Sequence, residues 1–542
     1  MRGRPFLRSP PFPGIAPSVA AVSLAADRNQ ASPPSDQLLD QIVQARVGGE
    51  FWGAQLTGVV CVVRAGVSVA PEMLKGLVPE QIAVLPGLPG GRVPGRRLSG
   101  PVDPWSLMAQ ARSVHAPPDD ELAIVAGMVG VPVHGPDGAV VSPENLRKAA
   151  RRVVAAAAYR DCFFGLPSDV AEVVEQLADW RRHIDGNRGI VAASGMAYWK
   201  REAIRHFLWD GRRCPPFLSP PKGLRRAERT GGTLAVWPSR VPTTLEQDAA
   251  QRGVAIAKVE DGFLRSKGLG AALTPPGSIV VDRSGIYYDA RSPSDLETLL
   301  ATHDFAPGLI DRARRLRAAI STSGVTKYGL EAGQMPDLPT GRRLVLVVGQ
   351  VEDDLSVQQG GAGVTGNLDL LRRVRSAEPD AHIIYRPHPD VQAGLRRGHL
   401  SEATILEHAD VVDSGAPLMT LVQVVDEVHV LSSLTGFEAL LRRRPVTVHG
   451  MPFFAGWGLT RDMAPINPRR GRSLTIDQLV AGALILYPRY LDPVTRLPCG
   501  PEVMVARLGG GSAPPTSWLS RVRTLEGKIR RFMTLSAEYL RG

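Results

Sequence analysis

The sequence has few cysteines and no long apolar run. The four cysteines of the 542-residue chain, Cys61, Cys162, Cys214 and Cys499, lie far apart and form no CxxC pair. This spacing excludes a disulfide framework and gives no sign of a zinc site, so we expect a protein of the reducing cytoplasm. No segment approaches the roughly 18 to 20 consecutive apolar residues of a membrane span, because Arg, Pro or Gly interrupts each candidate. We therefore expect no transmembrane helix.

Lysine is scarce in a chain that is otherwise basic. The net charge is +11, yet only eight of the 64 basic residues are lysine and the others are arginine. The arginines are dispersed and are not interleaved with aromatic residues, which make up 6% of the chain. Nucleic-acid binding proteins concentrate their basic residues in one stripe, so we expect no nucleic acid as partner. The charge favours anionic sugars, nucleotides or a lipid surface.

Length and patterning predict several α/β domains. The chain is too long for one core, and its 44% hydrophobic and 22% charged residues are typical of a globular protein. Short, β-branched runs such as GVAIAKVE, RRLVLVVGQ and EVHVLS alternate with helical patterns. This alternation predicts parallel sheets in two Rossmann-like domains that face each other across a cleft.

Composition divides the chain into five segments. Residues 1–40 are rich in Pro, Ser, Ala and Arg and have too little Leu or Ile for a signal sequence, so we predict a disordered tail. The other segments are a degenerate module (41–185), a Rossmann-like domain with the catalytic acid (190–340), a Rossmann-like nucleotide-binding domain (341–510) and a C-terminal helix (511–542).

The C-terminal helix is predicted to be amphipathic and basic. Helical spacing puts five apolar side chains on one face, opposite Arg and Lys residues: Trp518, Val522, Leu525, Ile529 and Phe532. Such a helix can lie on an anionic leaflet, or it can pack against the preceding domain. We expect peripheral contact with the membrane.

A weak internal sequence repeat begins before the two Rossmann-like domains. The segment Asp161–Leu177 aligns without a gap on Asp492–Leu508, and Val133-His134-Gly135 matches Val448-His449-Gly450 in the same order. The first copy has no counterpart of the motifs RPHP, SSLTGFE and PFFAGWG. We interpret residues 41–185 as a partial, inactive copy of the C-terminal module. Chance similarity among common residue types is the alternative.

An acidic motif follows one apolar strand. Glu260, Asp261 and Gly262 come directly after the predicted strand GVAIAKV. Ligands bind at the carboxyl ends of strands in α/β domains, so we expect these residues to lie near a ligand. A carboxylate there can act as a general base or as a covalent nucleophile, and Gly262 permits a tight backbone path. An acidic turn that pairs with Arg265 is the structural alternative.

A histidine between two prolines follows a second strand. The prolines of RPHP fix the backbone around His388, which can donate a proton to a leaving phosphate. Arg386 can bind a phosphate or a carboxylate through its planar guanidinium. The alternative is a Pro-rich loop with a histidine whose hydrogen bonds are satisfied locally.

A serine pair follows a third strand and opens a helix. Ser432 and Ser433 can cap that helix, or they can hold a phosphate together with the free backbone N–H groups at the helix start. In the next loop, GMPFFAGWG, Gly456 and Trp457 suit a cleft lining, although core packing of Trp457 is an alternative. Together the three motifs describe a nucleotide-sugar site between two domains.

The motifs resemble the capsule polysaccharide biosynthesis family typified by KpsC/LipB. The resemblance covers roughly residues 195–508 and rests on six segments in order: EDGFLRSKGLG, IVVDRSGIYYDARSPSDLETLL, YRPHPD, VHVLSSLTGFEALL, PVTVHGMPFFAGWGLTRD and LILYPRYLDPVT. It implies a GT-B-like α/β fold and a retaining transferase. The sugar implied is 3-deoxy-D-manno-oct-2-ulosonic acid (Kdo), moved from CMP-β-Kdo to a lipid-linked Kdo acceptor at the cytoplasmic face of the bacterial inner membrane.

The resemblance also implies roles for individual residues, as does a similarity to two-domain bacterial sialyltransferases, which use CMP-sugars without a metal. Asp261 would attack the anomeric carbon, His388 would assist departure of CMP, and Glu260 would tune Asp261 or help the acceptor hydroxyl. The implied donor-binding residues are Arg386, Pro389, Ser432, Ser433, Thr435, Gly436 and Glu438. The expected cleft-lining residues are Gly262, Arg265, Lys327, Gly456 and Trp457. No metal and no cofactor besides the donor are expected.

The chain departs from the family in two places. Full-length members carry two complete modules, whereas only the C-terminal one keeps its motifs here, so a single transfer is implied. Trp237-Pro238-Ser239 stands where the family usually has Trp-Gly, which changes the local turn. Three alternatives stay open: an inverting CMP-sugar transferase with Asp261 as base, a hydrolase or epimerase, and a non-catalytic scaffold that binds other capsule assembly proteins.

Overall fold

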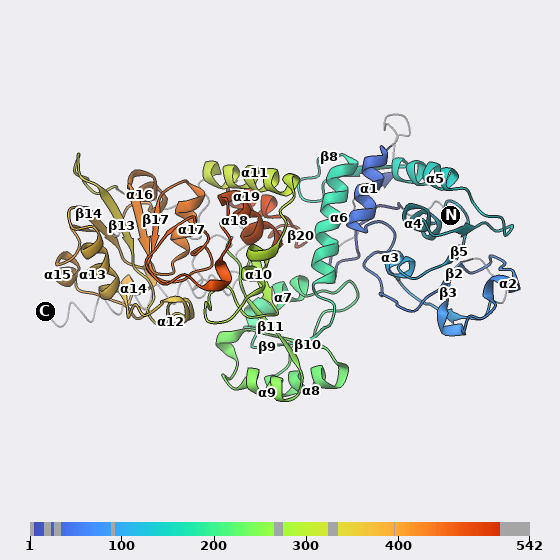
Figure 1. Ribbon diagram of the computed structural model, residues 1–542, viewed down its shortest axis with the longest axis horizontal. Coiled ribbons are helices and arrows are strands. Elements are labelled where there is room, and N and C mark those ends of the chain that lie inside the picture. Colours follow the sequence, from blue (N-terminus) through green and yellow to red (C-terminus); the bar gives the residue numbers. More distant parts are fainter. Residues whose placement is uncertain are drawn as a thin grey trace. The chain divides into compact units, whose positions relative to one another are not determined.

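The computed structural model describes residues 5–15, 23–25, 34–87, 93–264, 275–323, 334–394, 396–413 and 415–509, with the backbone alone for 23–25. The predicted helix over 511–542, Arg265 and Lys327 lie outside the described residues. The chain forms two compact units (Figure 1). Unit 1 comprises residues 1–190, 204–215 and 494–499, and unit 2 comprises residues 191–203, 216–493 and 500–542. Within the described ranges, no helix has the length and apolarity needed to cross a bilayer.

Unit 1 is built on a five-stranded parallel sheet with the strand order β4-β3-β2-β5-β6. The central strand β2 (Cys61–Arg64) pairs with β3 (Ile82–Leu85) and β5 (Ser113–His115), and the edges are β4 (Arg96–Arg97) and β6 (Val133–His134). The apolar side chains of β2 and β3 are buried, as expected for strands covered on both faces. The remaining elements of unit 1 are β1 (Ser23–Ala25), α1 (Asp36–Ala45), α2 (Pro71–Leu74), η1 (Pro79–Gln81), α3 (Pro104–Met108), α4 (Glu121–Val129), α5 (Pro143–Ala155), β7 (Ala157–Arg160), β8 (Pro167–Ser168), α6 (Val170–Asp185) and β20 (Pro498–Cys499).

Part of the predicted disordered tail is packed, so that prediction is wrong for residues 5–15. Phe6, Leu7 and Phe12 are buried, and the Phe12 ring lies 5.0 Å from the rings of both Trp180 and Trp209. Apolar side chains spaced through a Pro-rich segment can cover a core without forming a helix or a strand. The tail also ends early, because α1 begins at Asp36 with Ser35 as its N-cap.

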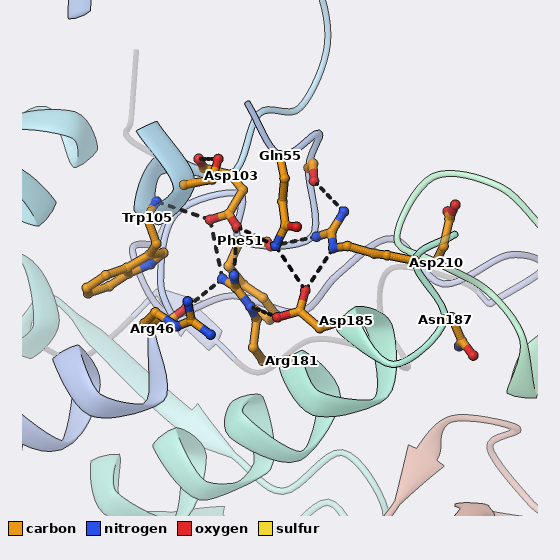
Figure 2. Close-up of polar contacts among 12 residues, drawn as sticks. Arg46, Phe51, Gln55, Asp103, Trp105, Arg181, Asp185, Asn187 and Asp210 are labelled. Atoms are coloured by element: carbon orange, nitrogen blue, oxygen red, sulfur yellow. Dashed lines mark hydrogen bonds and ion pairs between the residues drawn. The ribbon is translucent and has the colours of Figure 1, made fainter. Parts of the chain in front are cut away.

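A buried polar network fixes α6 within unit 1 (Figure 2). Arg181 of α6 forms an ion pair with Asp103 at 2.7 Å and a second one with Asp185 at 2.7 Å. Asp185 also accepts from Arg188 at 2.8 Å and from Gln55 at 3.3 Å. Burial raises the pKa of Asp103, and the Arg181 guanidinium opposes that rise. Because both Arg181 and Asp103 are buried, the loss of either would leave an uncompensated charge.

The first domain of unit 2 has a mixed sheet. Its strands within unit 2 follow the order β19-β12-β11-β10-β9, in which β10 and β11 are parallel, whereas β12 is antiparallel to both β11 and β19. Helices α8 and α9 pack on β10 and β11 (Figure 1). The elements are β9 (Ile190–Ser194), η2 (Tyr198–Lys200), α7 (Arg201–Phe207), α8 (Pro220–Thr230), β10 (Thr233–Val236), η3 (Pro238–Arg240), α9 (Leu245–Gln251), β11 (Ala255–Asp261), β12 (Ser278–Asp282), α10 (Asp295–Thr302), α11 (Pro307–Ser323) and β19 (Arg489–Leu491).

Two expectations for this domain need correction. The sheet is not wholly parallel, because the chain reverses direction between β11 and β12. The predicted boundary at residue 340 also assigned Arg489–Leu491 to the second domain, whereas this strand, β19, pairs with β12 of the first. β19 has three residues and lies more than 200 residues after β12 in the sequence. So short a strand carries no local sequence signal that would predict which strand it pairs with.

The second domain of unit 2 has the parallel sheet that the sequence predicts. Six strands follow the order β15-β14-β13-β16-β17-β18, and all their pairings are parallel. Helix α13 buries Leu370, Leu371 and Val374 against β13 and β14. The elements are β13 (Leu344–Val348), α12 (Leu355–Gly360), α13 (Asn367–Ala377), β14 (His382–Arg386), α14 (Pro389–Gln392), α15 (Glu402–Leu406), β15 (Val411–Val412), α16 (Leu418–Val424), β16 (Glu427–Val430), α17 (Leu434–Leu441), β17 (Val446–Val448), β18 (Arg461–Asp462), η5 (Pro468–Arg470), α18 (Ile476–Val480), the π-helix η6 (Ala481–Leu486) and α19 (Pro501–Gly509).

The sheet of unit 1 and the sheet of the second domain share one topology. The order β4-β3-β2-β5-β6 repeats β15-β14-β13-β16-β17, and all strands in both are parallel. The elements that follow also correspond. When Asp161–Leu177 is aligned on Asp492–Leu508, β8 aligns with β20, and the first residue of α6 aligns with the first residue of α19. That residues 41–185 are a degenerate copy of the C-terminal module stays a prediction, and the shared topology supports it.

Candidate active site

The acidic motif lies at the carboxyl end of β11. Glu260 and Asp261 are the last residues of that strand, and they pair with Val280 and Ile279 of β12. Both carboxylates are half-buried. The backbone N–H of Asp261 donates to Glu260 Oε1 at 3.2 Å, and Asp261 Oδ1 accepts from Lys200 Nζ at 2.9 Å. Asp261 thus forms an ion pair with Lys200. The alternative pairing with Arg265 involves a residue outside the described part of the chain.

Gly262 allows close backbone packing after the acidic motif. A Cβ on this residue would stand 2.4 Å from Ser278 Oγ, and its N–H donates to the Ser278 carbonyl at 3.0 Å. The next residue, Phe263, is buried and stacks on Phe453 of the second domain with 4.4 Å between ring centroids. This aromatic contact holds the end of β11 against the loop that follows β17.

That loop is part of the core, so the prediction that Gly456 and Trp457 line a cleft is wrong. Trp457 is fully buried, and its indole N–H donates to the Phe453 carbonyl at 2.8 Å. Gly456 is buried as well. Arg470 donates to the carbonyls of Pro452 and Ala455 at 2.6 and 2.9 Å. The core packing named as the alternative for Trp457 is what the structure shows.

His388 is held in one tautomer by the short helix that it caps. It is the N-cap of α14, and its Nδ1 accepts the backbone N–H of Asp390 at 3.1 Å. A ring nitrogen that accepts carries no proton, so the proton of the neutral imidazole is on Nε2. Pro389 is the first residue of α14, where proline favours the start of a helix.

Arg386 binds a carboxylate of its own chain. The side chain is buried, and its Nη1 donates to Asp413 Oδ2 at 2.6 Å and to the Ala416 carbonyl at 2.8 Å. Of the two ligands that the sequence left open for Arg386, a phosphate or a carboxylate, the structure shows the carboxylate of Asp413. This pair fixes the loop after β15 and gives the predicted donor contact no support.

Ser432 is oriented by Gln350, a residue that the sequence reasoning missed. The Ser432 N–H donates to Gln350 Oε1 at 2.8 Å, and its hydroxyl accepts from Gln350 Nε2 at 3.0 Å. Gln350 in turn donates its backbone N–H to Asn367 Oδ1 at 2.8 Å. The sequence signal that could have identified Gln350 is its position two residues after the apolar strand β13, because polar side chains at the carboxyl ends of parallel strands face the ligand edge.

Ser433 and its neighbours mainly build the start of α17. Ser433 is the N-cap and accepts the Thr435 N–H at 3.3 Å. Thr435 and Glu438 are buried, and a Cβ on Gly436 would stand 2.9 Å from the Phe454 ring. These contacts are structural, and they leave the half-buried Ser432 and Ser433 as the residues of this motif suited to a ligand.

The structure brings the three motifs to one region of unit 2. Gln350, His388 and Ser432 follow β13, β14 and β16, which are neighbours in one parallel sheet and therefore end at the same edge. Tyr288 of the first domain connects this edge to the acidic motif. A Cβ on Gly360 would stand 3.2 Å from the Tyr288 carbonyl oxygen and 3.9 Å from Ser432 Cβ. Burial raises the pKa of Tyr288, and the charge of Glu260 raises it further.

Family motifs without a catalytic group hold this region together. Asp282 is buried and accepts the Tyr487 hydroxyl at 2.7 Å, which joins the segments IVVDRSG and LILYPRY. Glu297 pairs with Arg470 at 2.9 Å, which ties the helix of SPSDLETLL to the 452–457 loop. Burial raises the pKa of Asp282, and the nearby Asp295 adds to the rise.

One group of the described residues has side chains that could bind a metal ion, but this group lies away from the candidate active site. Ligand atoms of Glu378, Glu427 and His429 come within 4.8 Å of one another. Glu427 begins β16, at the opposite end of the strand from Ser432. Arg343 already forms ion pairs with both Glu378 and Glu427, so a guanidinium neutralises these carboxylates. The group does not belong to the candidate active site.

Comparisons with known proteins agree on one family. The sequence profile of the capsule polysaccharide biosynthesis protein family matches residues 233–329 and 324–490. The chain is 39% identical over 331 residues to the capsule polysaccharide modification protein LipA of Neisseria meningitidis, across 61% of this chain and 47% of LipA. It is also 39% identical over 312 residues to the lipopolysaccharide-processing protein LpsZ of Rhizobium meliloti, across 56% of this chain and 70% of LpsZ. The chain therefore spans about half the length of LipA.

Two solved structures are similar in both sequence and fold. One is the β-Kdo 2,7 transferase of Thermosulfurimonas dismutans KpsC, with 33% identity, a TM-score of 0.50, and coverage of 59% of this chain and 99% of that one. The other is the β-Kdo 2,4 transferase of the same KpsC, with 31% identity, a TM-score of 0.51, and coverage of 59% and 98%. The α/β, GT-B-like fold predicted for the two Rossmann-like domains is confirmed. The chain belongs to the capsule polysaccharide biosynthesis family of KpsC, LipA and LpsZ.

Proposed function

We propose that this chain is a retaining glycosyltransferase that moves Kdo from CMP-β-Kdo to a lipid-linked Kdo acceptor in capsule biosynthesis. The two KpsC structures, each named as a β-Kdo transferase, support the sugar. The observation that carries the proposal is the carboxylate of Asp261 at the carboxyl end of a strand, paired with a lysine, with a serine pair and a histidine at the sheet edge of the second domain. The proposal includes a reaction at the cytoplasmic face of the inner membrane, beside other capsule assembly proteins, and the resemblance to the family supports this part of it.

The first step is an attack by Asp261. One carboxylate oxygen forms a bond to the anomeric carbon of Kdo, and the bond from that carbon to the phosphate oxygen breaks, so that CMP leaves with the electron pair. His388 Nε2–H can donate to the departing phosphate, because Nδ1 is occupied by the Asp390 N–H. Ser432 and Ser433 would hold that phosphate through their hydroxyls and the N–H groups at the start of α17.

The second step restores the carboxylate and the anomeric configuration. The acceptor hydroxyl oxygen attacks the same carbon, the ester bond to Asp261 breaks, and the hydroxyl proton passes to Glu260. Two displacements at one carbon give net retention, as in retaining glycosidases. Asp261 acting as a base on the acceptor would instead give inversion in one step, without a covalent intermediate.

A transfer assay tests the proposal. Purified wild type and Asp261→Asn are incubated with CMP-β-Kdo, generated in situ, and a synthetic Kdo-terminated lipid acceptor, and the products are followed by mass spectrometry. We expect one added Kdo with wild type and a loss of about a thousandfold or more in kcat with the variant. The exposed Asp248→Asn in the same domain serves as the matched control and should retain activity. Intact donor and no product with wild type would contradict the proposal.

A further inference from the structure

Helix α8 presents a basic stripe on the surface of the first domain of unit 2. The helix buries Leu224 and Ala227 against the sheet, and its opposite side points away from the sheet (Figure 1). On that side, four basic residues follow the helical spacing i, i+3, i+4 and i+7: Lys222, Arg225, Arg226 and Arg229. Three of them are exposed and Arg226 is half-buried, so the basic stripe is open to a ligand.

No carboxylate neutralises the basic stripe within the part of the chain that the structure describes. Arg226 donates to the Val191 carbonyl at 2.8 Å, and Glu228, which borders the stripe, pairs with Arg252 at 3.5 Å. Like charges three and four residues apart repel each other and weaken a helix. Lys222 also stands in the first turn, where the helix dipole disfavours a cation. The stripe therefore lowers the stability of α8, and a bound anion would restore it.

Apolar side chains border the basic stripe. Leu218 lines an open groove of about 600 Å³ together with the four basic residues and Glu228. Arg201 Cζ lies 5.4 Å from the ring centroid of Phe217, the residue before Leu218, and 5.9 Å from the ring centroid of Tyr198. Tyr198 is 81% exposed, more than any other large hydrophobic residue that the structure describes. Basic side chains beside an exposed aromatic ring are typical of surfaces at the boundary between water and lipid.

We propose that the basic stripe and Tyr198 together form a docking surface for a bilayer that contains anionic phospholipids; the choice of a bilayer rests on the proposed function, whose acceptor is linked to a lipid. Headgroup phosphates neutralise Lys222, Arg225 and Arg229, and Leu218 and Tyr198 contact the upper part of the acyl chains. A soluble anion would neutralise the charges but would leave Tyr198 in water. The pairing of charge with apolar surface is what favours a lipid surface.

The docking surface adjoins the acidic motif. Tyr198 and Lys200 belong to the same η2 turn, and Lys200 Nζ lies 2.9 Å from Asp261 Oδ1. A bilayer held at Tyr198 therefore keeps the sugar of a lipid-linked acceptor close to the proposed nucleophile, which reduces the cost of bringing the two together. This arrangement favours acceptors carried by a lipid over soluble ones.

Flotation with phospholipid vesicles tests the proposal. The full-length protein is mixed with vesicles of phosphatidylcholine, either alone or with about one third phosphatidylglycerol, and the bound fraction gives the Kd. We expect wild type to bind only the vesicles with phosphatidylglycerol, and to bind them less tightly as NaCl is raised. Lys222→Gln/Arg225→Gln/Arg229→Gln should weaken binding about a hundredfold, which is roughly fivefold per charge. Tyr198→Ser should weaken it about fivefold.

The matched control removes three charges from another helix. Arg147→Gln/Lys148→Gln/Arg152→Gln on the exposed surface of α5 changes the net charge by the same amount and should bind like wild type. Equal losses in the two triple variants would show attraction by net charge alone, and they would overturn the docking surface. If the α8 triple variant fails to fold, Lys222→Gln alone decides: a fivefold loss supports the surface, and wild-type affinity overturns it.

Three other results would overturn the proposal. Wild type that binds neither kind of vesicle has no such surface. Wild-type affinity in the folded α8 triple variant would assign membrane contact to another segment, such as residues 511–542. Loss of vesicle binding in inorganic phosphate, at an ionic strength where chloride permits binding, would show a site for a soluble anion. Failure of the proposed function looks different, because flotation measures no transfer: wild type would then bind the vesicles and move no Kdo.

Discussion

At the scale of single residues, the candidate site depends on side chains that orient the reactive groups. Gln350 uses both ends of its amide on Ser432, and Lys200 holds one oxygen of Asp261. His388 is fixed by a backbone N–H two residues further along the chain. The groups expected to react thus occupy defined positions before any substrate binds, which lowers the cost of ordering them during the reaction.

Gln350→Leu tests whether Ser432 contributes through its orientation. The substitution removes both hydrogen bonds to Ser432 and keeps a side chain of similar size, so donor binding should weaken. We expect the KM for CMP-Kdo to rise about fivefold to tenfold with a smaller change in kcat. Steady-state kinetics beside Gln423→Leu, an exposed glutamine of the same domain, checks this. Equal kinetics for the two variants would show that Gln350 does not act through Ser432.

The residue types of the site could be predicted from the sequence, but not all of their partners. Asp261, His388 and Ser432 were found because each follows an apolar strand at a position where a ligand edge is expected. The partner of Arg386, Asp413, could not be predicted from the sequence because it lies on a loop 27 residues away. Lys200 and Gln350 were missed because a single polar residue after a strand carries no motif.

At the scale of elements, two sheets bury histidines next to their central strands. His115 of β5 stacks on His134 of β6 with 4.8 Å between centroids, and His429 of β16 lies 3.1 Å from His449 across one hydrogen bond. Burial lowers the pKa of His115 to about 4, that of His429 to about 3 and that of His449 to about 4. These histidines are therefore neutral in the folded protein at pH 7.

Acid should destabilise the protein because of these histidines. In the unfolded chain they take up protons below about pH 6.5, whereas the folded chain resists protonation down to about pH 4, so the free energy of unfolding falls as the pH drops through that window. Denaturant unfolding at pH 7 and pH 5 measures the fall. His115→Leu should reduce this fall by about 2 kcal/mol for the transition of unit 1, while the exposed His399→Leu should not. An unchanged pH dependence in His115→Leu would contradict the lowered pKa.

The elements themselves were largely predictable, and their pairing was less so. The parallel sheet of the second domain follows from apolar, β-branched strands such as β13 and β16, which must be buried on both faces. β19 was assigned to the wrong domain because three residues carry no information about a partner strand in a distant segment. The packing of residues 5–15 could not be predicted, because proline-rich composition favours a disordered tail and gives no sign that Phe6 and Phe12 are buried.

At the scale of the whole molecule, one sheet topology occurs twice, and the two sheets differ at the edge where we propose the donor site. In unit 1 the helix after the fourth strand begins at Asp120, the place that Ser433 occupies in unit 2. Asp120 forms a two-bond ion pair with Arg64 at the end of β2, at 2.7 and 2.9 Å. A carboxylate of the chain itself thus lies at the position where, under the proposed function, the second domain of unit 2 would hold a phosphate. We therefore expect one donor site per chain.

The most direct test of the account is the mass of the intact protein after incubation with CMP-β-Kdo in the absence of acceptor. The account predicts one Kdo bound covalently per chain, located by peptide mapping on Asp261 and missing in Asp261→Asn. Addition of the acceptor should release it as product. Kdo on two sites, Kdo on another residue, or transfer to acceptor with no covalent intermediate at any time point would contradict the account.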